Sequence, residues 1–587
     1  GQHLMDCLSH ENTRVRLGNL PMEYVKSSPY LLSFMDKYEL KKRIVSALSH
    51  SDVKKYGKIN ALLLSRYAIN NYRPIPAANG KLKYLHDLVF GERHEKKTQL
   101  LLWVPASNPY YKAGGVFESN EARNFSKIIL FSSWEMVPRM ISIMMSYYSE
   151  LYTFGELKKT VPEIRYTSQK KNRYGENRLR ADGLLEYPCR TLASLFSPAI
   201  FYGEKLSSIR KIIKQNIQEE FARNSLIRTI PQQGRNNARL VLTLMKILDG
   251  KPVENLTGLY VPSNALDVMT DIAIASPAVC AYRQSGNEED AQMVAKAVVS
   301  VFNKPESAAV IDLMYNKKND DNYYESVLDY CAIGNLQAVL DEYLYMAPEN
   351  KKLGQVVTDA IIGTSNLSID TTDSLGKEEK KQLMRCHFAI PFIDKTVTDK
   401  SVTRTTNIRK AFNSPFRPFL LSTTSIGQEG LDFHWYARKI VHWNLPSNPV
   451  DLEQREGRIN RFKCLAIRRN VVKLYASETY HTWDELFSMA YSNLKGMHSD
   501  IVPYWCLPVA ELTEEQRAKL EYIERIVPLY PLSRDRYKYE RLIKVLALYR
   551  MTLGQPRQEE LLSLLRNMHL SDEQLKELTI DLCPYNK

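Results

Sequence analysis

Residues 418–462 alternate short apolar runs with polar turns, and this alternation constrains the fold more than any other feature of the chain. The runs 418–425 and 439–446 read as strands, and a turn that contains two glycines follows the first of them. Residues 450–462 read as a helix, with Pro449 placed where a proline suits a helix start. Strands that alternate with helices in this way predict an α/β sheet.

Further strand and helix signals belong to the same predicted sheet. Residues 127–133 form an apolar run that ends in two serines, and apolar residues at helical spacing follow over 136–145. Residues 386–392 read as another strand, and 406–414 as a helix. Residues 471–477, which contain two valines and a tyrosine, read as the strand that closes the sheet.

Residues 151–385 separate the two sets of strand signals, and their apolar residues recur mostly at helical spacing. We therefore expect a large, mostly helical insertion within an α/β lobe built from residues 76–150 and 386–480. Residues 481–587 read as a helical C-terminal extension, and residues 1–75 as a helical segment that precedes the lobe. The clearest helical signals are 205–223, 236–250, 289–303, 323–346 and 542–568.

Composition is compatible with a nucleic-acid partner but does not require one. The chain has 587 residues, enough for about three to five domain-sized units. It carries 80 Lys and Arg against 66 Asp and Glu, a net charge of +14. Such an excess favours a polyanionic partner, because each neutralised phosphate releases counterions. A generally basic, soluble surface explains the same excess.

The eight cysteines are scattered, and none lies in a Cys-x-x-Cys pair. Zinc modules normally show paired spacing, so no metal site is expected. Scattered thiols fit a reducing compartment, and the sequence shows no signal peptide and no apolar run of bilayer length. We therefore expect a cytoplasmic protein.

The helix expected at 450–462 contains the pattern Gln454, Gly457, Arg458 and Arg461. On a continuous helix, Gln454, Arg458 and Arg461 are three or four residues apart and share one face. A guanidinium is permanently cationic and can bond two phosphate oxygens at once, while Gly457 allows close approach of a backbone. A solvated basic helix is the alternative, but the complete pattern after a glycine turn and a strand argues against it.

The turn at 427–432 and the pattern that follows it resemble motifs V and VI of superfamily 2 helicases and Snf2-type translocases. These motifs belong to the second of two RecA-like lobes, so the resemblance implies a RecA-like parallel sheet. It implies that Arg461 is the arginine finger of ATP hydrolysis and that Arg458 is its neighbour at the phosphates. Gln454 would orient the arginines or contact the nucleotide, with Gly457 close by.

The resemblance also implies roles within the segment 422–432. Thr423 and Thr424 would contact nucleic-acid phosphate, while Gly430 and Asp432 would face ATP. Hydroxyls and backbone N–H groups in a glycine turn suit such ligands. A plain turn after a strand, with Asp432 as a helix cap, is the alternative reading.

Residues 129–134 resemble motif IV of the same superfamily, in which Ser132 and Ser133 would meet nucleic-acid phosphate. A core strand that ends in a polar turn has the same pattern, so this assignment is the least specific of the three. Arg404 and the Phe-Asn pair at residues 412–413 resemble the segment that precedes motif V.

Residues 165–180 carry six basic side chains against one acid, with two tyrosines among them. Lys170, Lys171 and Arg173 lie near the centre of this segment. Long cationic side chains reach phosphates and aromatic rings stack on unpaired bases, so the segment is a candidate nucleic-acid surface. A solvated loop has the same composition.

A phosphate-binding loop, which an ATP-driven motor needs, is not evident. Gly-Lys pairs occur at 57–58, 80–81, 250–251 and 376–377, and none is followed by Ser or Thr. ATP and Mg²⁺ are therefore expected as cofactors only together with a first RecA-like lobe, and the chain alone is expected not to hydrolyse ATP efficiently. We expect the C-terminal half of a larger translocase, with residues 1–75 as the end of the first lobe or the linker between lobes.

The expected partners are nucleic acid, more specifically DNA, and a first RecA-like lobe in the same protein or a separate subunit, with no membrane. Residues 25–35, 327–343 and 548–562 are similar to large bacterial helicase-like proteins that are often linked to phage defence. An alternative is a non-enzymatic nucleic-acid-binding or scaffold protein that docks a separate ATPase lobe or a nuclease. A third hypothesis is an enzyme with its active site in the helical insertion. The sequence of the insertion shows no Ser/His/Asp, Cys/His or metal constellation that would support it.

Overall fold

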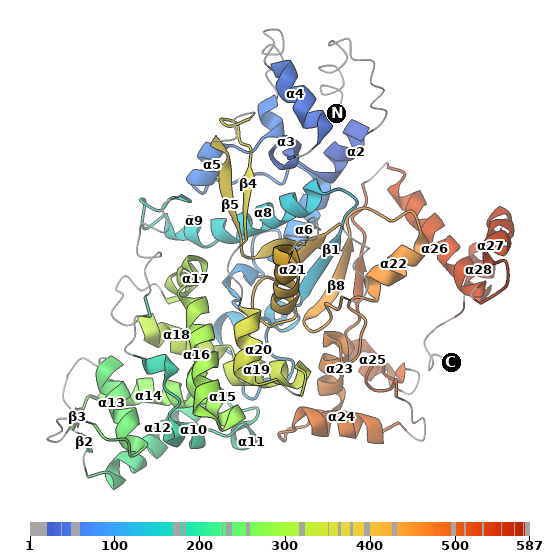
Figure 1. Ribbon diagram of the computed structural model, residues 1–587. Helices are drawn as coiled ribbons and strands as arrows, with labels where there is room; N and C mark the ends of the chain where they lie inside the picture. The colour runs from blue at the N-terminus through green and yellow to red at the C-terminus, as the bar shows by residue number, and fades with distance from the viewer. Residues whose placement is uncertain are drawn as a thin grey trace.

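In the computed structural model, a parallel sheet of five strands forms the centre of the molecule, with helices packed around it (Figure 1). The strand order is β6-β7-β1-β8-β9, and every neighbouring pair is parallel. The strands are β1 (Lys127–Phe131), β6 (Ala389–Phe392), β7 (Leu420–Thr423), β8 (Ala437–His442) and β9 (Glu524–Ile526). This arrangement confirms the α/β, RecA-like fold that the sequence predicts.

The structure describes most of the chain. The described residues are 20–36, 38–48, 59–167, 178–179, 183–225, 227–229, 238–253, 259–315, 323–349, 351–361, 365–375, 380–392, 399–424, 431–494, 500–509, 512–530, 533–552, 554–568, 570–578 and 580. Within these ranges no single helix has the length and apolar character needed to cross a membrane. The bent helix pair Asn264–Ala275 and Pro277–Ser285 meets that test only when its two halves are taken together.

Strand β1 lies in the middle of the sheet although the chain returns to the sheet only after a long insertion. Ile129 is opposite Leu421 of β7 on one side and Ile440 of β8 on the other. All five β1 residues are buried, including Lys127, whose Nζ donates to the carbonyl oxygen of Phe416 at 2.5 Å. The segments before and after the insertion therefore share one core.

Helix α8 (Met136–Leu151) packs against β6 and β7. Nearly all of its side chains are buried. Small polar residues let it approach the strands closely: Ser142 Oγ lies 3.0 Å from Ser422 Oγ, and Ser146 Oγ accepts from the backbone N–H of Ala389 at 3.2 Å. This close contact anchors the β-α unit at 127–151 to the rest of the sheet.

The insertion is mostly helical, as the sequence predicts. Its longer helices are α12 (Leu206–Arg223), α13 (Ala238–Leu248), α14 (Ser263–Ala275), α15 (Pro277–Ser285), α16 (Glu288–Phe302), α17 (Pro305–Tyr315), α18 (Tyr323–Ile333), α19 (Leu336–Met346) and α20 (Leu353–Ala360). The expected single helix at 323–346 is two helices, because Asn335 adopts a left-handed φ of 52° between them. Its Oδ1 accepts from the backbone N–H groups of Tyr110 and Tyr111, which fixes this break.

The expected closing strand at 471–477 is wrong, since these residues continue helix α23 (Leu465–Tyr475) beyond Val471. Ile467 and Val471 are four residues apart and pack into a small core with Trp483 of helix α24 (Trp483–Ser492). The strand that closes the sheet is β9, whose sequence Glu-Arg-Ile carries little strand signal. It lies in the segment that was expected to be helical.

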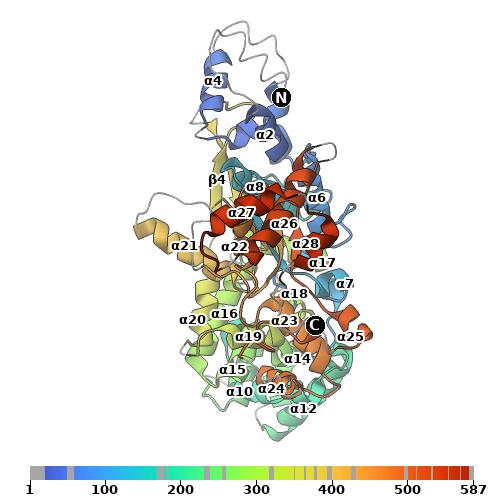
Figure 2. The same cartoon turned by 90° about the vertical axis from the view of Figure 1, so that its right-hand side faces the viewer.

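Helical segments precede and follow the lobe in the sequence. The N-terminal helix α4 (Glu39–Leu48) lies near the hairpin of β4 (Ser365–Ile369) and β5 (Gln382–Cys386), where Lys41 pairs with Asp370, whereas α2 (Leu20–Ser27) lies farther from this hairpin (Figure 1). The C-terminal helices α26 (Asp535–Met551), α27 (Gln558–Asn567) and α28 (Asp572–Leu578) group together and project from the body (Figures 1 and 2). The expected helix at 542–568 is therefore divided between α26 and α27. Helix α26 packs on α22 (Pro449–Glu456) through Leu452, Leu542 and Leu546.

Candidate functional site

Many of the predicted site residues lie at one edge of the sheet. Strands β7, β1 and β8 are parallel neighbours, so their carboxyl ends meet at that edge. Thr423 ends β7, Ser132 follows β1, and β8 leads through a short loop into α22. Ligands of open parallel α/β sheets generally bind outside this edge. The carboxyl edge is therefore the candidate site.

Arg461 and Asp432 form an ion pair on the exposed side of this edge. Nε of Arg461 lies 3.1 Å from Oδ1 of Asp432, and the two side chains are 40% and 36% exposed. An ion pair this exposed contributes about 0–1 kcal/mol. The pair therefore orients the guanidinium, yet it can exchange the carboxylate for the oxygens of a ligand at small cost.

Asn413 fixes the backbone that carries Asp432. Its Nδ2 donates to the carbonyl oxygen of Asp432 at 2.7 Å, and its Oδ1 accepts from the backbone N–H of Trp435 at 3.4 Å. The neighbouring Phe412 is fully buried. The Phe-Asn pair seen in the sequence thus positions the end of the glycine turn, while the side chain of Arg404 is outside the described residues.

The continuous helix expected over 450–462 is wrong. Helix α22 ends at Glu456, Gly457 is its C-cap, and the next residues form a turn. The backbone N–H of Phe433 donates to the carbonyl oxygen of Arg458 at 2.9 Å. This bond ties the turn to the chain that follows the glycine turn, so the two arginines of the pattern do not share a helical face.

Arg455 and Arg458 lie against the ring of Phe131 at the end of β1. Their guanidinium carbons are 5.3 and 6.0 Å from the ring centre, and the residues are only 2% and 7% exposed. Nη1 of Arg455 donates to the carbonyl oxygen of Asn444 at 3.3 Å, and burial lowers the pKa of Arg455 to about 10. Sequence reasoning missed Arg455, although its spacing of three from the buried Leu452 is a signal for the inner face of the helix.

Gln454 and Arg458 do not share one accessible face, although Gly457 between them still makes a helical backbone hydrogen bond. Gln454 is exposed, whereas Arg458 is buried. The backbone N–H of Gly457 donates to the carbonyl oxygen of Glu453 at 2.7 Å, and a Cβ atom at Gly457 would lie only 3.3 Å from that oxygen. The structure therefore leaves Gln454 and Arg461 accessible and places Arg458 inside the lobe.

Asn444, which the sequence did not single out, connects the end of β1 with the end of β8. Ser132 Oγ donates to Asn444 Oδ1 at 2.8 Å, and the backbone N–H of Ser133 donates to the same oxygen at 3.3 Å. Asn444 Nδ2 in turn donates to Ser27 Oγ of α2 at 3.2 Å. Ser132 is fully buried in this network, whereas Ser133 is exposed.

Thr423 and Thr424 differ in exposure in the same way as Ser132 and Ser133. Thr423 is 2% exposed, and its carbonyl oxygen accepts from the backbone N–H of Ser132 at 3.0 Å. Thr424 is partly exposed. Direct side-chain contact with a ligand at this edge therefore suits Ser133 and Thr424 better than their buried neighbours.

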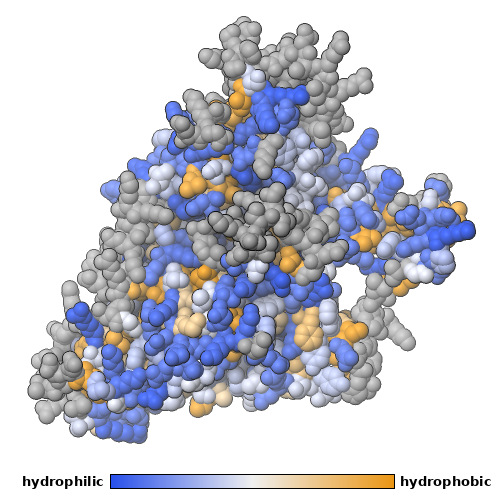
Figure 3. Space-filling view, in the orientation of Figure 1, coloured by the Kyte–Doolittle hydropathy of each residue, from blue (hydrophilic) through white to orange (hydrophobic). Residues whose placement is uncertain are grey.

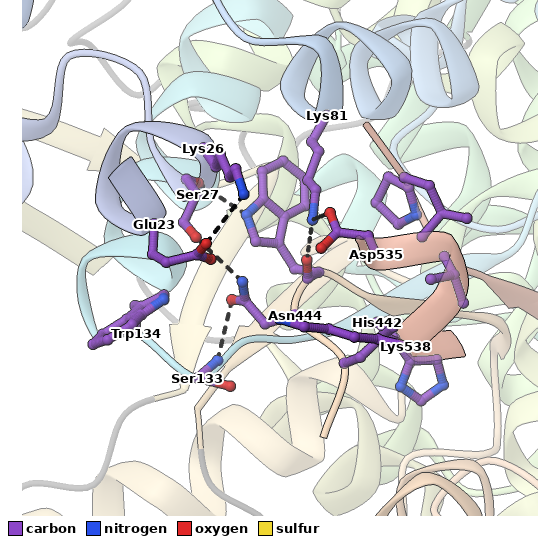
Figure 4. A pocket seen from close by; sticks show the side chains of 15 residues that line it. Glu23, Lys26, Ser27, Lys81, Ser133, Trp134, His442, Asn444, Asp535 and Lys538 are labelled. Carbon is purple, nitrogen blue, oxygen red and sulfur yellow. Dashed lines mark hydrogen bonds and ion pairs between the residues drawn. The ribbon is translucent and has the colours of Figure 1, made fainter. Parts of the chain in front are cut away.

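A pocket of about 190 Å³ opens at this edge, between the ends of β1, β8 and β9 and the helices α2, α6 (Gly80–Phe90) and α26 (Figure 4). Lys81 Nζ lies 4.0 Å from Oδ2 of Asp535, and burial lowers the pKa of Lys81. Lys26 pairs with Glu23 at 3.1 Å. Two of the lysines in the pocket are thus accompanied by acids of the same pocket.

Two histidines beside the edge are buried. Burial, together with the charges of Arg468, Arg461 and Arg409, lowers the pKa of His434 to about 3. Burial also lowers the pKa of His442, the last residue of β8. Both rings are therefore neutral at physiological pH and act as packing groups.

Some predicted site residues lie outside the described residues. They are Gly430, Lys170, Lys171 and Arg173, and their roles stay predictions. Within the described ranges, no group of three or more His, Cys, Asp or Glu side chains is arranged to hold a metal ion.

Comparison with known proteins relates the candidate site to one family. Residues 363–463 match the family model described as the helicase conserved C-terminal domain. No curated protein and no solved structure matches the chain significantly. The matched span contains β6, β7, β8 and α22 but not β1, which the structure places between β7 and β8. The chain thus carries a helicase-type C-terminal lobe, and the tertiary structure adds the strand at 127–131 to it.

Proposed function

We propose that this chain supplies the C-terminal motor lobe of an ATP-dependent DNA helicase or translocase of superfamily 2, close to the Snf2 type. The observation that carries the proposal is the position of Arg461, an accessible guanidinium oriented by Asp432 at the carboxyl edge of a RecA-like sheet. Motors of this kind place an arginine from one unit against the triphosphate bound by another.

The residues at this edge fit a triphosphate that another lobe holds. ATP with Mg²⁺ would supply the phosphoryl group that is transferred to water. Arg461 would neutralise the charge that develops on the phosphoryl oxygens, and Arg458 would hold the motif in place from inside the lobe. Gln454, Gly457, Gly430 and Asp432 would border the nucleotide, while the first RecA-like lobe would bind the Mg²⁺ and the β-phosphate.

DNA backbone contact is proposed for the other side of the same edge. Ser133 and Thr424 are accessible there and carry hydroxyl groups, with Ser132 and Thr423 behind them. The net charge of +14 supports a polyanionic track. Lys170, Lys171 and Arg173 would add contacts to phosphate.

We further propose a bacterial cytoplasmic setting and a link to phage defence, from the resemblance of the sequence to helicase-like proteins of that kind. None of the six described cysteines is in a disulfide bond, which supports a reducing compartment. Docking of a separate ATPase lobe or nuclease without hydrolysis is the competing function, and the experiment below separates the two.

The test is nucleic-acid-stimulated ATP hydrolysis by the chain together with its first lobe, in the full-length protein or in the complex. Arg461→Ala should lower turnover about a thousandfold with an unchanged circular dichroism spectrum, because the guanidinium acts in the transition state. Arg536→Ala, at an exposed arginine of α26, is the matched control and should retain full turnover.

Full turnover of the Arg461→Ala protein would contradict the finger assignment. Hydrolysis by the isolated chain that depends on Arg461 would contradict the division of the ATP site between two lobes. Absence of hydrolysis in the wild-type complex, with binding of the partner retained, would support the scaffold function instead.

A further inference from the structure

Two exposed aromatic rings follow Arg461. Phe462 is 43% exposed and Trp505 is 39% exposed, and their ring centres are 6.4 Å apart at 64°. On the face drawn in Figure 3, hydrophobic residues lie among hydrophilic ones beneath the projecting C-terminal helices. Large aromatic side chains are usually buried in their own fold, so an exposed pair beside a cationic edge points to a ligand.

The Phe462 ring is supported from below by other aromatic rings. It stacks on Tyr504 at 5.3 Å and 24°, and Tyr504 stacks on Phe487 at 5.5 Å and 5°. Phe487 is 2% exposed and belongs to the small core of α23 and α24. One face of Phe462 therefore rests on a fixed stack, which reduces the entropy lost when a planar ligand binds the exposed side.

The backbone after Phe462 is also held in place. Lys463 adopts a left-handed φ of 52°, which costs a residue with a Cβ about 1 kcal/mol or more. Its N–H donates to the carbonyl oxygen of Tyr504 at 2.7 Å, and its Nζ lies 4.2 Å from the ring centre of Tyr345. These contacts maintain the conformation that directs Phe462 outward.

The charge around the two rings defines the chemistry of the ligand. Arg461 precedes Phe462 in the chain, and Lys463 follows it, so cationic side chains flank the ring on both sides in the sequence. A planar group that carries phosphate fits this surface, because it combines a face for stacking with negative charge. A neutral apolar peptide would contact the rings but would not use the exposed guanidinium of Arg461.

We propose that Phe462 and Trp505 form a stacking platform for an unpaired nucleobase beside Arg461. The inference rests on the proposed function and deepens it. The base must be unpaired, because base faces are accessible in a free nucleotide or an unpaired strand and not within a duplex. The base can come from the nucleotide at Arg461 or from a single strand, and the stacking chemistry is the same.

For the strand, the experiment measures fluorescence anisotropy of a labelled thymidine 20-mer and of an abasic strand of equal length at low salt. Phe462→Ala and Trp505→Ala should each weaken binding of the thymidine strand about tenfold and leave binding of the abasic strand unchanged. Phe462→Trp should retain affinity. Tyr67→Ala, at a 65% exposed tyrosine far from motif VI in the sequence, is the matched control.

For the nucleotide, the experiment measures ATP hydrolysis by the chain with its first lobe. If the base belongs to ATP, Phe462→Ala should raise KM for ATP about tenfold without changing inhibition by inorganic triphosphate, which has no base.

Dependence on the base in one of these assays supports the platform. Equal losses for ligands with and without bases would overturn it and indicate that the rings support contacts to phosphate or sugar, or the local fold, instead of a base. A wild-type protein that binds neither strand nor nucleotide would overturn the proposed function first, and the platform with it.

Discussion

Two arginine–carboxylate pairs, whose arginines are seven residues apart in the chain, have similar nitrogen–oxygen distances but very different exposure. Arg461 Nε lies 3.1 Å from Asp432, and Arg468 Nε lies 2.8 Å from Glu342. The first pair is 40% and 36% exposed, whereas the second is 0% and 1% exposed. Water screens the first pair, so it can be exchanged for a ligand, while the second has no solvent to replace a lost partner.

The buried pair also joins two parts of the molecule. Arg468 lies on α23, shortly after Arg461 in the chain, and Glu342 lies on α19 of the helical insertion. Nη1 of Arg468 donates to the carbonyl oxygen of Lys463 at 2.7 Å, and Glu342 accepts from the backbone N–H and the hydroxyl of Ser107 at 2.7 Å each. The insertion is therefore packed into the RecA-like lobe through a network that includes the chain next to Arg461.

Breaking the buried pair should have the largest effect on stability. Arg468→Met leaves the Glu342 carboxylate buried without its guanidinium, so the free energy of unfolding should fall by about 3–5 kcal/mol. Urea unfolding monitored by circular dichroism measures the change. The double variant Arg468→Met with Glu342→Gln should recover part of the loss, because a neutral amide still accepts from Ser107. A double variant no more stable than the single one would show that the cost does not come from the unpaired carboxylate.

Asp341, the residue before Glu342, tests a partly buried carboxylate in a different environment. Its Oδ2 accepts from the hydroxyl of Tyr110 at 2.8 Å, and burial raises its pKa from 3.8 to about 6. A group with a raised folded pKa stabilises the fold fully below its unfolded pKa, and this contribution is lost as the pH rises through the folded value.

The wild-type free energy of unfolding should therefore lose about 2 kcal/mol from this group between pH 4 and pH 7. Asp341→Asn does not titrate, so the difference between the two proteins should change by that amount over the same pH range. Urea unfolding at several pH values measures it. A difference that stays constant from pH 4 to pH 7 would contradict the raised pKa.

Breaking the exposed pair should have the smallest effect on stability. Arg461→Ala should change the free energy of unfolding by less than about 1 kcal/mol, because both side chains of the Arg461–Asp432 pair are solvated. Thermal or urea unfolding of the same protein used for the ATPase assay measures this directly. A loss as large as that of Arg468→Met would show that Arg461 has a structural role.

The local patterns that the sequence predicted well are those that one segment can satisfy alone. The helices at 205–223 and 289–303 and the strands near 420 and 440 are present. Predictions for segments whose structure depends on tertiary contacts with other segments were less accurate. Residues 471–477 have strand-like composition but form part of α23, because Val471 packs against α24. Helix α22 stops at Glu456, because the following turn bonds to Phe433.

Prediction of the candidate site was limited in the same way, because part of it depends on contacts between distant segments. The pattern of Gln454, Gly457, Arg458 and Arg461 indicated the correct region of the sheet. It did not indicate that Arg458 is buried against Phe131, a residue more than 300 positions earlier in the chain. Nor did it reveal Asn444, whose importance comes from its bonds to the end of β1 and to α2. Such contacts depend on which strands are adjacent.

The sequence by itself determined the α/β class, the helicase-type motifs and several of the strands and helices around them, because these depend on residue types at short spacing. Only the tertiary structure decided which arginine is accessible, since Phe131 and the turn after α22 bury Arg458 and leave Arg461 in solvent. It also decided that β1 enters the centre of the sheet and that β9 closes it. Burial and strand order arise from contacts between distant segments, and no local pattern encodes them.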